Sequence, residues 1–374
     1  MKRKVLLGIT MLLICTSLSF IHAQTWKTPV LEASPIYDGS VYYIQNTKLN
    51  LSLAAGADWG TRAIVSSSAL PVTIHIDKKT NLNVLEFSAG KTLFITNDGY
   101  TYTDNTYNNQ WNIQLKDAEK LTYTIQTSSS YTSLYNKNKY LGVDVALGTK
   151  NIVSYNLDQA TAADYIEWKF LNLTLLDARK ALYNALKTSV GTEVDITSYE
   201  SVYQNSTDPS EVSLAASNLS KAVLDYKASI ATPENPVDLT YLIVNPAFAD
   251  NNADGWENPG TVNYHEVEFY QSTFNMYQQI QGLPAGKYTL KAQAFERPKA
   301  NDSGAAYKAG TETIYARLYA DATDFSERNT PFNSLYKHTY TGTGSSNGYA
   351  NTMQAAEIMF VNKTKEYYEI ALPD

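Results

Sequence analysis

The chain has 374 residues and a formal net charge of −7 at pH 7, and 44% of its residues are hydrophobic. An acidic chain without a run of Lys and Arg repels phosphate polymers, which argues against nucleic acid as a partner. The sequence has one cysteine and four histidines, without metal-ligand spacing, but 29 tyrosines. This composition favours a binding protein over an enzyme.

Residues 1–23 have the pattern of a secretory signal peptide, with basic residues 2–4, an apolar run over 5–20 and a cleavage site at Ala23. Its removal takes away Cys15 and moves the net charge to −10. A lipoprotein acylated at Cys15 and an uncleaved anchor are alternatives, although the apolar run is shorter than the roughly 20 residues that span a bilayer. We expect export to the periplasm, the outer surface or the medium.

The rest of the chain is too long for one core, so two or three domains are expected. Residues 24–173 and 233–374 show short alternating apolar runs, whereas 174–232 show helical spacing. No later segment has the length and hydropathy of a membrane span. The sequence predicts a multidomain, mostly β chain with an intervening three-helix bundle.

The first β segment contains a loose threefold repeat. Lysine-centred elements begin at Lys48, Lys91 and Lys139, and two of the three units end on a tryptophan strand, at Trp111 and Trp168. This pattern resembles the ricin-B-type β-trefoil lectins, which implies a closed barrel of twelve short strands. In that family the closing tryptophans pack in the core, so the resemblance places saccharide contacts in the loops before them.

Two loops combine aromatic rings with carboxylate or amide groups, the mixture that a pyranose ring requires. The first contains Asp58 and Trp59, and the second spans 96–109. The predicted saccharide contacts in the two loops are Asp58, Trp59, Asp98, Tyr100, Tyr102 and Tyr107. The alternative is a polar hairpin whose tyrosines cover a small domain.

The helical segment predicts three helices. Leu175, Ala178 and Leu182 share one face of the first, which begins near Thr174 and Asp177. A capping box over 197–200 opens the second, and Asp208 with Pro209 opens the third. The segment resembles the FIVAR-type modules of bacterial surface proteins, which implies a spacer between binding domains.

The last segment contains Asn245, Pro246 and Phe248, then Gly255 and Trp256, and later the turn 282–288. These residues resemble the galactose-binding-like jelly-roll modules that accompany bacterial glycoside hydrolases, which implies a β-sandwich. The sequence stops soon after its last predicted strand, so we expect either that this domain ends atypically or that it is truncated. Saccharide contacts are predicted for Trp256, Tyr264, Tyr277, Arg297 and Asn351. Trp256 plugging the sandwich and Arg297 in a surface ion pair are the alternatives.

Residues 250–255 match the first half of a calcium loop, with Asp250, Asp254 and Glu257 as side-chain ligands. Thr261 stands at the twelfth position, where such a loop needs a glutamate. A solvated turn is therefore favoured over structural calcium, and no other cofactor is expected. The pair Glu266 and Glu268 is read as an acidic surface rather than as the two carboxylates of a glycosidase.

These observations predict a monomeric, exported, non-catalytic protein that binds a polysaccharide or a glycoconjugate glycan. One alternative is the accessory part of a glycoside hydrolase whose catalytic domain lies outside this sequence. A second alternative is a surface adhesin that binds protein.

Overall fold

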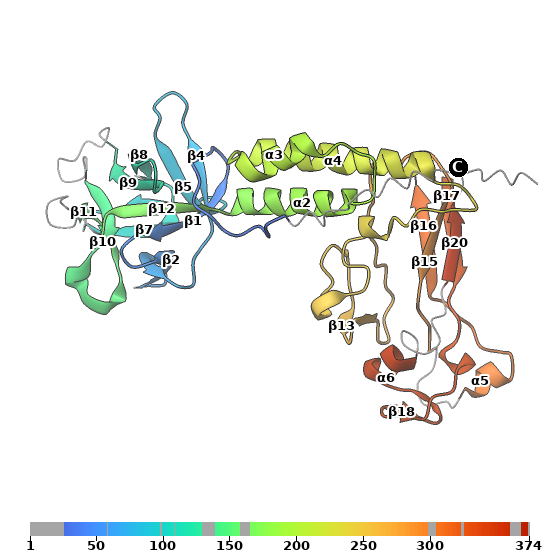
Figure 1. The fold of residues 1–374 in the computed structure, drawn as a ribbon. Coiled ribbons are helices and arrows are strands. Elements are labelled where there is room, and N and C mark those ends of the chain that lie inside the picture. Colours follow the sequence, from blue (N-terminus) through green and yellow to red (C-terminus); the bar gives the residue numbers. More distant parts are fainter. Residues whose placement is uncertain are drawn as a thin grey trace, which may run out of the picture. The chain divides into compact units, whose positions relative to one another are not determined.

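A computed structural model describes residues 26–57, 59–97, 99–107, 109–128, 139–157, 165–297, 304–322, 325–359 and 368–372. The predicted signal peptide, residues 1–23, lies outside this part. The chain divides into two compact units, residues 1–221 and 222–374, which are described separately (Figure 1). The described residues include no helix long and apolar enough to cross a membrane.

The first unit begins with twelve short strands that form one antiparallel sheet. They are β1 (Val41–Asn46), β2 (Leu51–Ala57), β3 (Arg62–Ser66), β4 (Val72–Ile76), β5 (Asn83–Ser88), β6 (Lys91–Ile95), β7 (Thr101–Asn105), β8 (Gln110–Asp117), β9 (Thr122–Thr127), β10 (Tyr140–Val143), β11 (Val153–Leu157) and β12 (Glu167–Asn172). A short 3-10 helix, η1 (Val145–Lys150), joins β10 to β11.

Six of these strands close into a ring, in which β1 pairs with β4, β4 with β5, β5 with β8, β8 with β9, β9 with β12, and β12 with β1. The other six form three hairpins, β2–β3, β6–β7 and β10–β11. A closed sheet has no edge strand left to pair with other chains. Four strands repeated three times, with the outer two of each unit in the ring, constitute a β-trefoil, which confirms the predicted barrel.

The core of this barrel contains both predicted tryptophans. Trp111 and Trp168 are fully buried, and their indole nitrogens donate 3.0 Å hydrogen bonds to the carbonyl oxygens of Leu93 and Leu141. In the first repeat, β4 instead buries Val72 and Ile74. A buried indole needs a partner for its N–H, and the second strand of the same repeat supplies it each time.

Three helices follow the barrel directly: α2 (Leu173–Ser189), α3 (Thr197–Asn205) and α4 (Pro209–Ile230), with α3 and α4 running along α2 (Figure 1). The apolar stripe of α2 is buried as predicted, at Leu175, Ala178, Leu182, Ala185 and Leu186. The three-helix prediction is thus confirmed in its elements, whereas the FIVAR likeness and the domain boundaries at 173 and 232 stay predictions.

Two of the three predicted helix starts were wrong in detail. The side chain of Asn172 caps α2 by accepting from the Leu175 amide at 2.9 Å, because the Thr174 hydroxyl accepts from the Val41 amide in the barrel. At α3, Asp195 accepts from the Thr197 amide at 3.0 Å, so no capping box forms. The third start is confirmed, since Asp208 accepts from Ser210 beside Pro209.

The chain segment before β1 connects the barrel to the helices. Ala33 forms a bridge with Leu171, and the Glu32 carboxylate lies 2.8 Å from the Arg179 guanidinium on α2. Nearer the N-terminus, the Trp26 indole donates to Glu200 on α3 at 2.9 Å. The helices and the barrel are therefore joined within the first unit by more than the single peptide link at 172–173.

The described strands of the second unit form four two-stranded antiparallel pairs. They are β13 (Thr261–Asn263) with β14 (Glu266–Glu268), β15 (Tyr288–Ala292) with β20 (Tyr368–Leu372), β16 (Arg317–Ala322) with β17 (Phe325–Pro331), and β18 (Ser345–Ser346) with β19 (Tyr349–Ala350). The last predicted strand is thus present and pairs along its whole length. These pairs do not complete two facing sheets, so the jelly-roll stays a prediction.

Short helices connect these pairs: η2 (Thr240–Leu242), η3 (Ala249–Asn251), α5 (Ala305–Lys308), η4 (Leu335–Lys337) and α6 (Met353–Glu357). A small core gathers near η4, β19 and α6, where Leu335, Tyr336, Tyr349 and Met359 are buried. The rings of Tyr336 and Tyr349 meet edge to face at 4.8 Å, an arrangement that aromatic pairs prefer.

Candidate functional site

The three hairpins of the trefoil contact one another. The Thr103 amide on β7 donates to the Thr61 carbonyl beside β3, and the Val65 amide donates to the Asn151 carbonyl, both at 3.0 Å. The third contact runs from the Tyr155 amide on β11 to the Gly99 carbonyl at 3.2 Å. Each hairpin thus borders the other two, and residues far apart in sequence become neighbours.

This arrangement brings together the two loops that the sequence predicted as separate sites. Arg62 on β3 pairs with Tyr102 on β7 in antiparallel register. Because the strands are antiparallel, the residues before Arg62 run alongside those after Tyr102. Trp59, at the turn between β2 and β3, therefore lies toward the end of β7 that leads to Tyr107.

Arg62 holds this junction together. Its guanidinium carbon lies 4.1 Å from the centroid of the Tyr100 ring and 5.5 Å from that of Tyr102, and its Nη2 donates to the Tyr102 hydroxyl at 3.0 Å. A planar guanidinium suits this geometry because it can stack on one ring while it donates in its own plane. Trp59, Arg62, Tyr100, Tyr102 and Tyr107 are called the hairpin site below.

The rings of the hairpin site differ in exposure. Trp59 is 86% exposed and Tyr107 is 50% exposed, whereas Tyr102 is only 7% exposed. Phe94 on β6 lies 5.9 Å from Tyr102 and 4.8 Å from Tyr107, centroid to centroid. Tyr102 therefore has little free surface, whereas Trp59 and Tyr107 offer free ring area. Whether any of the three contacts a saccharide stays a prediction.

Asp58 and Asp98, which the sequence also predicted, lie outside the described residues. Arg62 was missed by the sequence analysis, although it stands three residues after Trp59 in a segment poor in cations. Its position beside two tyrosines depends on a contact across 40 residues of sequence, and no local pattern reports such a contact.

The structure gives Trp256, in the second unit, a packing role. Its indole donates to the Asn245 carbonyl at 3.1 Å, and its ring lies 5.6 Å from that of Phe248. The side chain is half-buried. These contacts favour the alternative in which Trp256 is a packing residue. Tyr264 and Tyr277 remain partly exposed.

Arg297 and Asn351, predicted separately as saccharide contacts, lie against each other. The Arg297 guanidinium donates to the Asn351 side-chain oxygen and also approaches the Ala350 carbonyl at 3.5 Å. A side-chain oxygen and a backbone oxygen thus share the guanidinium, in place of the carboxylate that a surface ion pair would supply. Whether a saccharide binds there stays a prediction.

The carboxylates predicted for calcium are not grouped. Among the described residues, no three His, Cys, Asp or Glu side chains come close enough to hold a metal ion. Asp250 lies within η3, and Asp254 follows it in a turn where its amide donates to Asn252 at 3.0 Å. We expect that adding calcium to chelator-treated protein leaves its melting temperature unchanged, which differential scanning calorimetry can check.

An acidic cluster lies where β14 meets α6. Burial, and then the nearby charges of Glu357 and Glu268, raise the pKa of Glu266 to about 8. Its Oε1 is buried without a hydrogen-bond partner among the described residues. The His265 ring lies 3.2 Å from Glu357 beside it. Glu266 therefore carries a proton at neutral pH.

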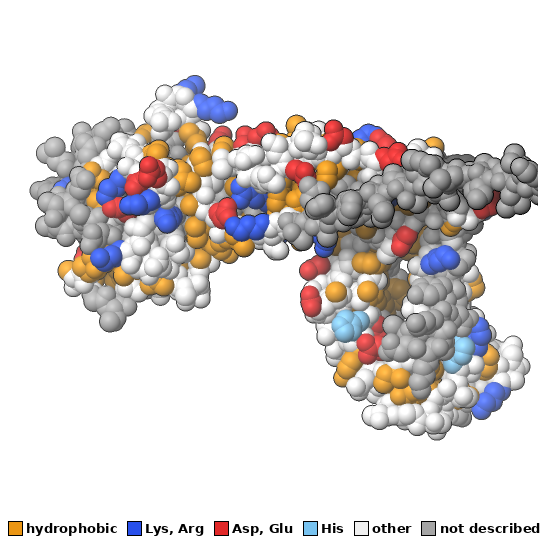
Figure 2. Space-filling view, viewed as in Figure 1, with side chains coloured by type: hydrophobic (Ala, Val, Ile, Leu, Met, Phe, Trp, Pro, Cys, Tyr) orange, Lys and Arg blue, Asp and Glu red, His pale blue; other side chains and the backbone are white. Residues whose placement is uncertain are grey.

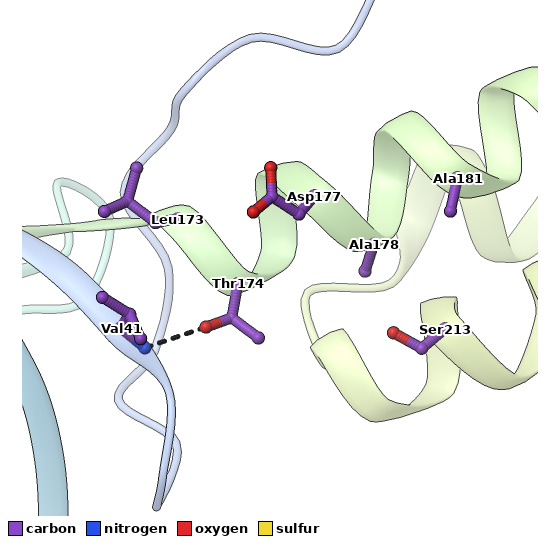
Figure 3. Close-up of a pocket in the computed structure, with 7 residues that line it drawn as sticks. All are labelled: Val41, Leu173, Thr174, Asp177, Ala178, Ala181 and Ser213. Carbon is purple, nitrogen blue, oxygen red and sulfur yellow. Dashed lines mark hydrogen bonds between the residues drawn. The ribbon is translucent and has the colours of Figure 1, made fainter. Parts of the chain in front are cut away.

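A shallow hollow of about 490 Å³ lies beside α2 (Figure 3). Its walls are mainly apolar and come from Val41, Leu173, Thr174, Asp177, Ala178, Ala181 and Ser213. The Thr174 hydroxyl is already engaged with the Val41 amide at 2.8 Å, as the dashed line shows. Asp177 is the one charged residue among those that line the hollow. One carboxylate beside an engaged hydroxyl is too few polar groups for a specific ligand site.

The fold and the hairpin site define a β-trefoil protein with a helical extension and a second, mostly irregular unit. No family model and no curated protein sequence matches the chain. It is similar to a ricin B-like lectin from Macrolepiota procera in complex with lactose, at 17% identity over 37% of this chain and 98% of that one, with a TM-score of 0.29.

Two further solved structures are similar to a comparable degree. A proteinase inhibitor from Coprinopsis cinerea shares 11% identity over 37% of this chain and all 100% of its own, with a TM-score of 0.29. SeviL bound to asialo-GM1 saccharide shares 11% over 36% and 98%, with a TM-score of 0.28. At these values the trefoil assignment rests on the strand pairing described above, not on the similarities.

Proposed function

We propose that this chain is an exported, non-catalytic carbohydrate-binding protein whose trefoil binds saccharide at the hairpin site. One observation carries the proposal: Trp59, 86% exposed, lies on a tight turn beside the stacked Arg62 and Tyr100. A tryptophan ring this exposed is free to pack against the apolar face of a sugar ring, with its N–H available to a hydroxyl.

The chemistry around Trp59 suits a sugar. Pyranose rings present C–H groups on their faces and hydroxyl groups at their edges, so they need a flat apolar surface with acceptors close by. Trp59 and Tyr107 supply ring surface, and Asp104 is exposed near the end of β7. The surface in Figure 2 has interspersed acidic and basic side chains along the helices, without a broad basic area on the described part of that face.

The fold by itself does not decide this function, since a trefoil supports many activities. The test is a glycan-array screen of the exported protein, with Trp59→Ala and Leu115→Ala side by side. Leu115 is a matched control because it is 53% exposed on β8, outside the hairpin site. Binding that Trp59→Ala abolishes and Leu115→Ala preserves supports the proposal.

If the well-folded protein binds none of the plant, host and microbial glycans on the array, the proposal is overturned. That result would favour the alternative of an adhesin that binds protein, because an exposed tryptophan is also a common anchor at protein interfaces.

A further inference from the structure

The trefoil repeats its hairpin contacts three times, so a ligand site on the hairpins has three pseudo-equivalent places. They are the β3–β7 junction at Arg62 and Tyr102, the β7–β11 junction at Tyr100 and Ser154, and the β3–β11 junction at Ile64 and Ile152. The described residues of the three junctions differ in chemistry, and this difference indicates which junction suits a saccharide.

At the β7–β11 junction, polar groups are satisfied by backbone. The Ser154 hydroxyl donates to the Gly99 carbonyl at 2.7 Å, and the Thr101 hydroxyl donates to the Val153 carbonyl at 2.9 Å. Ser154 and Thr101 are buried. This junction contributes to the fold and has no polar side chain directed outward among these residues.

At the β3–β11 junction, the contact is aliphatic. Ile152 is buried, Ile64 faces it across an isolated bridge, and the link is the backbone bond from Val65 to Asn151. The turn after β10 carries Val145, 54% exposed, where the turn after β2 carries Trp59. A valine offers no flat ring for a sugar face.

We infer that the described residues of the trefoil build one composite saccharide site, which its first and second repeats form together. Trp59 and Arg62 come from the first repeat, and Tyr100 and Tyr107 come from the second. The inference rests on the proposed function and deepens it, because it assigns the site to the boundary between two repeats rather than to the loops of each repeat.

Arg62 is the positioning residue of this composite site. Its charge is engaged by the Tyr100 ring and the Tyr102 hydroxyl, so it acts on the ligand by fixing the distance between the two loops. A lysine keeps the charge but loses the planar stacking and the fixed direction of the donor. Arg62→Lys should therefore weaken binding although it conserves charge.

The experiment is isothermal titration calorimetry of the full exported chain with a panel of monovalent oligosaccharides: lactose, cellobiose, mannobiose, xylobiose and chitobiose. Any sugar that binds is titrated into wild type, Trp59→Ala, Tyr107→Ala, Arg62→Lys and the controls Leu115→Ala and Val145→Ala. Melting temperatures are recorded for every variant, so that a loss of fold is separated from a loss of contact.

We expect at least about tenfold weaker binding for Trp59→Ala and for Arg62→Lys, and wild-type affinity for both controls. A protection experiment checks where the sugar binds. Bound sugar should shield Trp59 from oxidation by N-bromosuccinimide, and peptide mass spectrometry measures the oxidation of each tryptophan. Trp111 and Trp168 are fully buried and provide the internal reference.

One result overturns the composite site while the lectin function survives: binding that Trp59→Ala and Arg62→Lys leave unchanged. If no sugar of the panel binds and the glycan array is also silent, the proposed function fails and the composite site fails with it.

Discussion

The Arg62 guanidinium stacks on the Tyr100 ring at 4.1 Å, although 37 intervening residues separate the two in the chain. Arg62 belongs to the first hairpin of the trefoil and Tyr100 precedes the second strand of the next hairpin. This one contact joins two repeats, and the antiparallel pairing of Arg62 with Tyr102 directs the turn with Trp59 toward the end of β7 that leads to Tyr107. The functional proposal depends on this junction, so its energetics are the first thing to measure.

A double-mutant cycle with Arg62→Met and Tyr100→Leu measures this contact. We expect a coupling of about 0.5–2 kcal/mol in the free energy of unfolding, the range for a cation over an aromatic ring from exposed to desolvated settings. Urea denaturation followed by circular dichroism provides the values. A parallel cycle between Arg62→Met and Leu115→Ala should give no coupling, and equal values in both cycles would contradict the stacking.

Replacing the buried Trp168 should lower the stability of the trefoil, whereas replacing the exposed Trp59 should leave stability nearly unchanged. Replacing the buried Trp168 by Ala should cost about 3–5 kcal/mol, because it leaves a cavity and removes the bond to the Leu141 carbonyl. Trp59→Ala should change stability by less than about 0.5 kcal/mol, since its ring contacts mostly water. Urea unfolding measures both, with Trp168→Phe as a milder variant if Trp168→Ala does not fold. Equal costs for the two would show that Trp59 is packed.

Glu266 predicts a pH dependence in the second unit. Its folded pKa of about 8 lies above the ordinary value of 4.5, so the folded state binds the proton more tightly than the unfolded state. This contribution to stability is complete below about pH 4.5 and is lost as the pH rises toward 8. The second unit should therefore melt at a lower temperature at pH 8 than at pH 5.

Glu266→Gln removes the titration and should flatten the melting temperature of this unit between pH 5 and 8, as measured by scanning calorimetry. Glu327→Gln is the control, because Glu327 is exposed on β17 and is not one of the charges that raise the pKa of Glu266. A Glu266→Gln protein that keeps the wild-type pH dependence would show that His265, Glu357 or another group controls it.

Arg179 should stabilise the link between barrel and helices. It bonds to the Glu32 carboxylate at 2.8 Å and to the Ser206 carbonyl at 3.1 Å, and its side chain is 14% exposed. Arg179→Met should lower the free energy of unfolding by about 1–3 kcal/mol, since hydrogen bonds to a charged group are lost. Glu32→Gln removes a more exposed partner and should cost less than about 1 kcal/mol. Equal and negligible losses in urea denaturation would contradict this role.

Much of the fold could be read from local patterns. The threefold repeat predicted the twelve strands, and the spacing of Leu175, Ala178 and Leu182 predicted the buried face of α2. The core role of Trp111 and Trp168 was also predicted correctly. These features repeat at intervals of two, 3.6 or about forty residues, and periodicity in the sequence records which side chains face inward.

The details that failed share a cause. The Thr174 hydroxyl was expected to open α2, but it accepts from Val41, which lies 133 residues earlier in the chain. Glu200 was expected to complete a capping box, but it accepts from the Trp26 indole across 174 residues. In both cases a tertiary partner occupies a group that the local pattern had assigned to the helix end.

The sequence by itself therefore determined the closed β barrel, the helical segment and the presence of two polar, aromatic loops. Only the tertiary structure decided that these loops lie side by side, because the pairing of Arg62 with Tyr102 depends on how the repeats close around the barrel. It also decided which rings are free, since burial of Tyr102 and exposure of Trp59 depend on neighbours such as Phe94. Periodicity is a property of one segment, whereas a site between two repeats exists only after the sheet has closed.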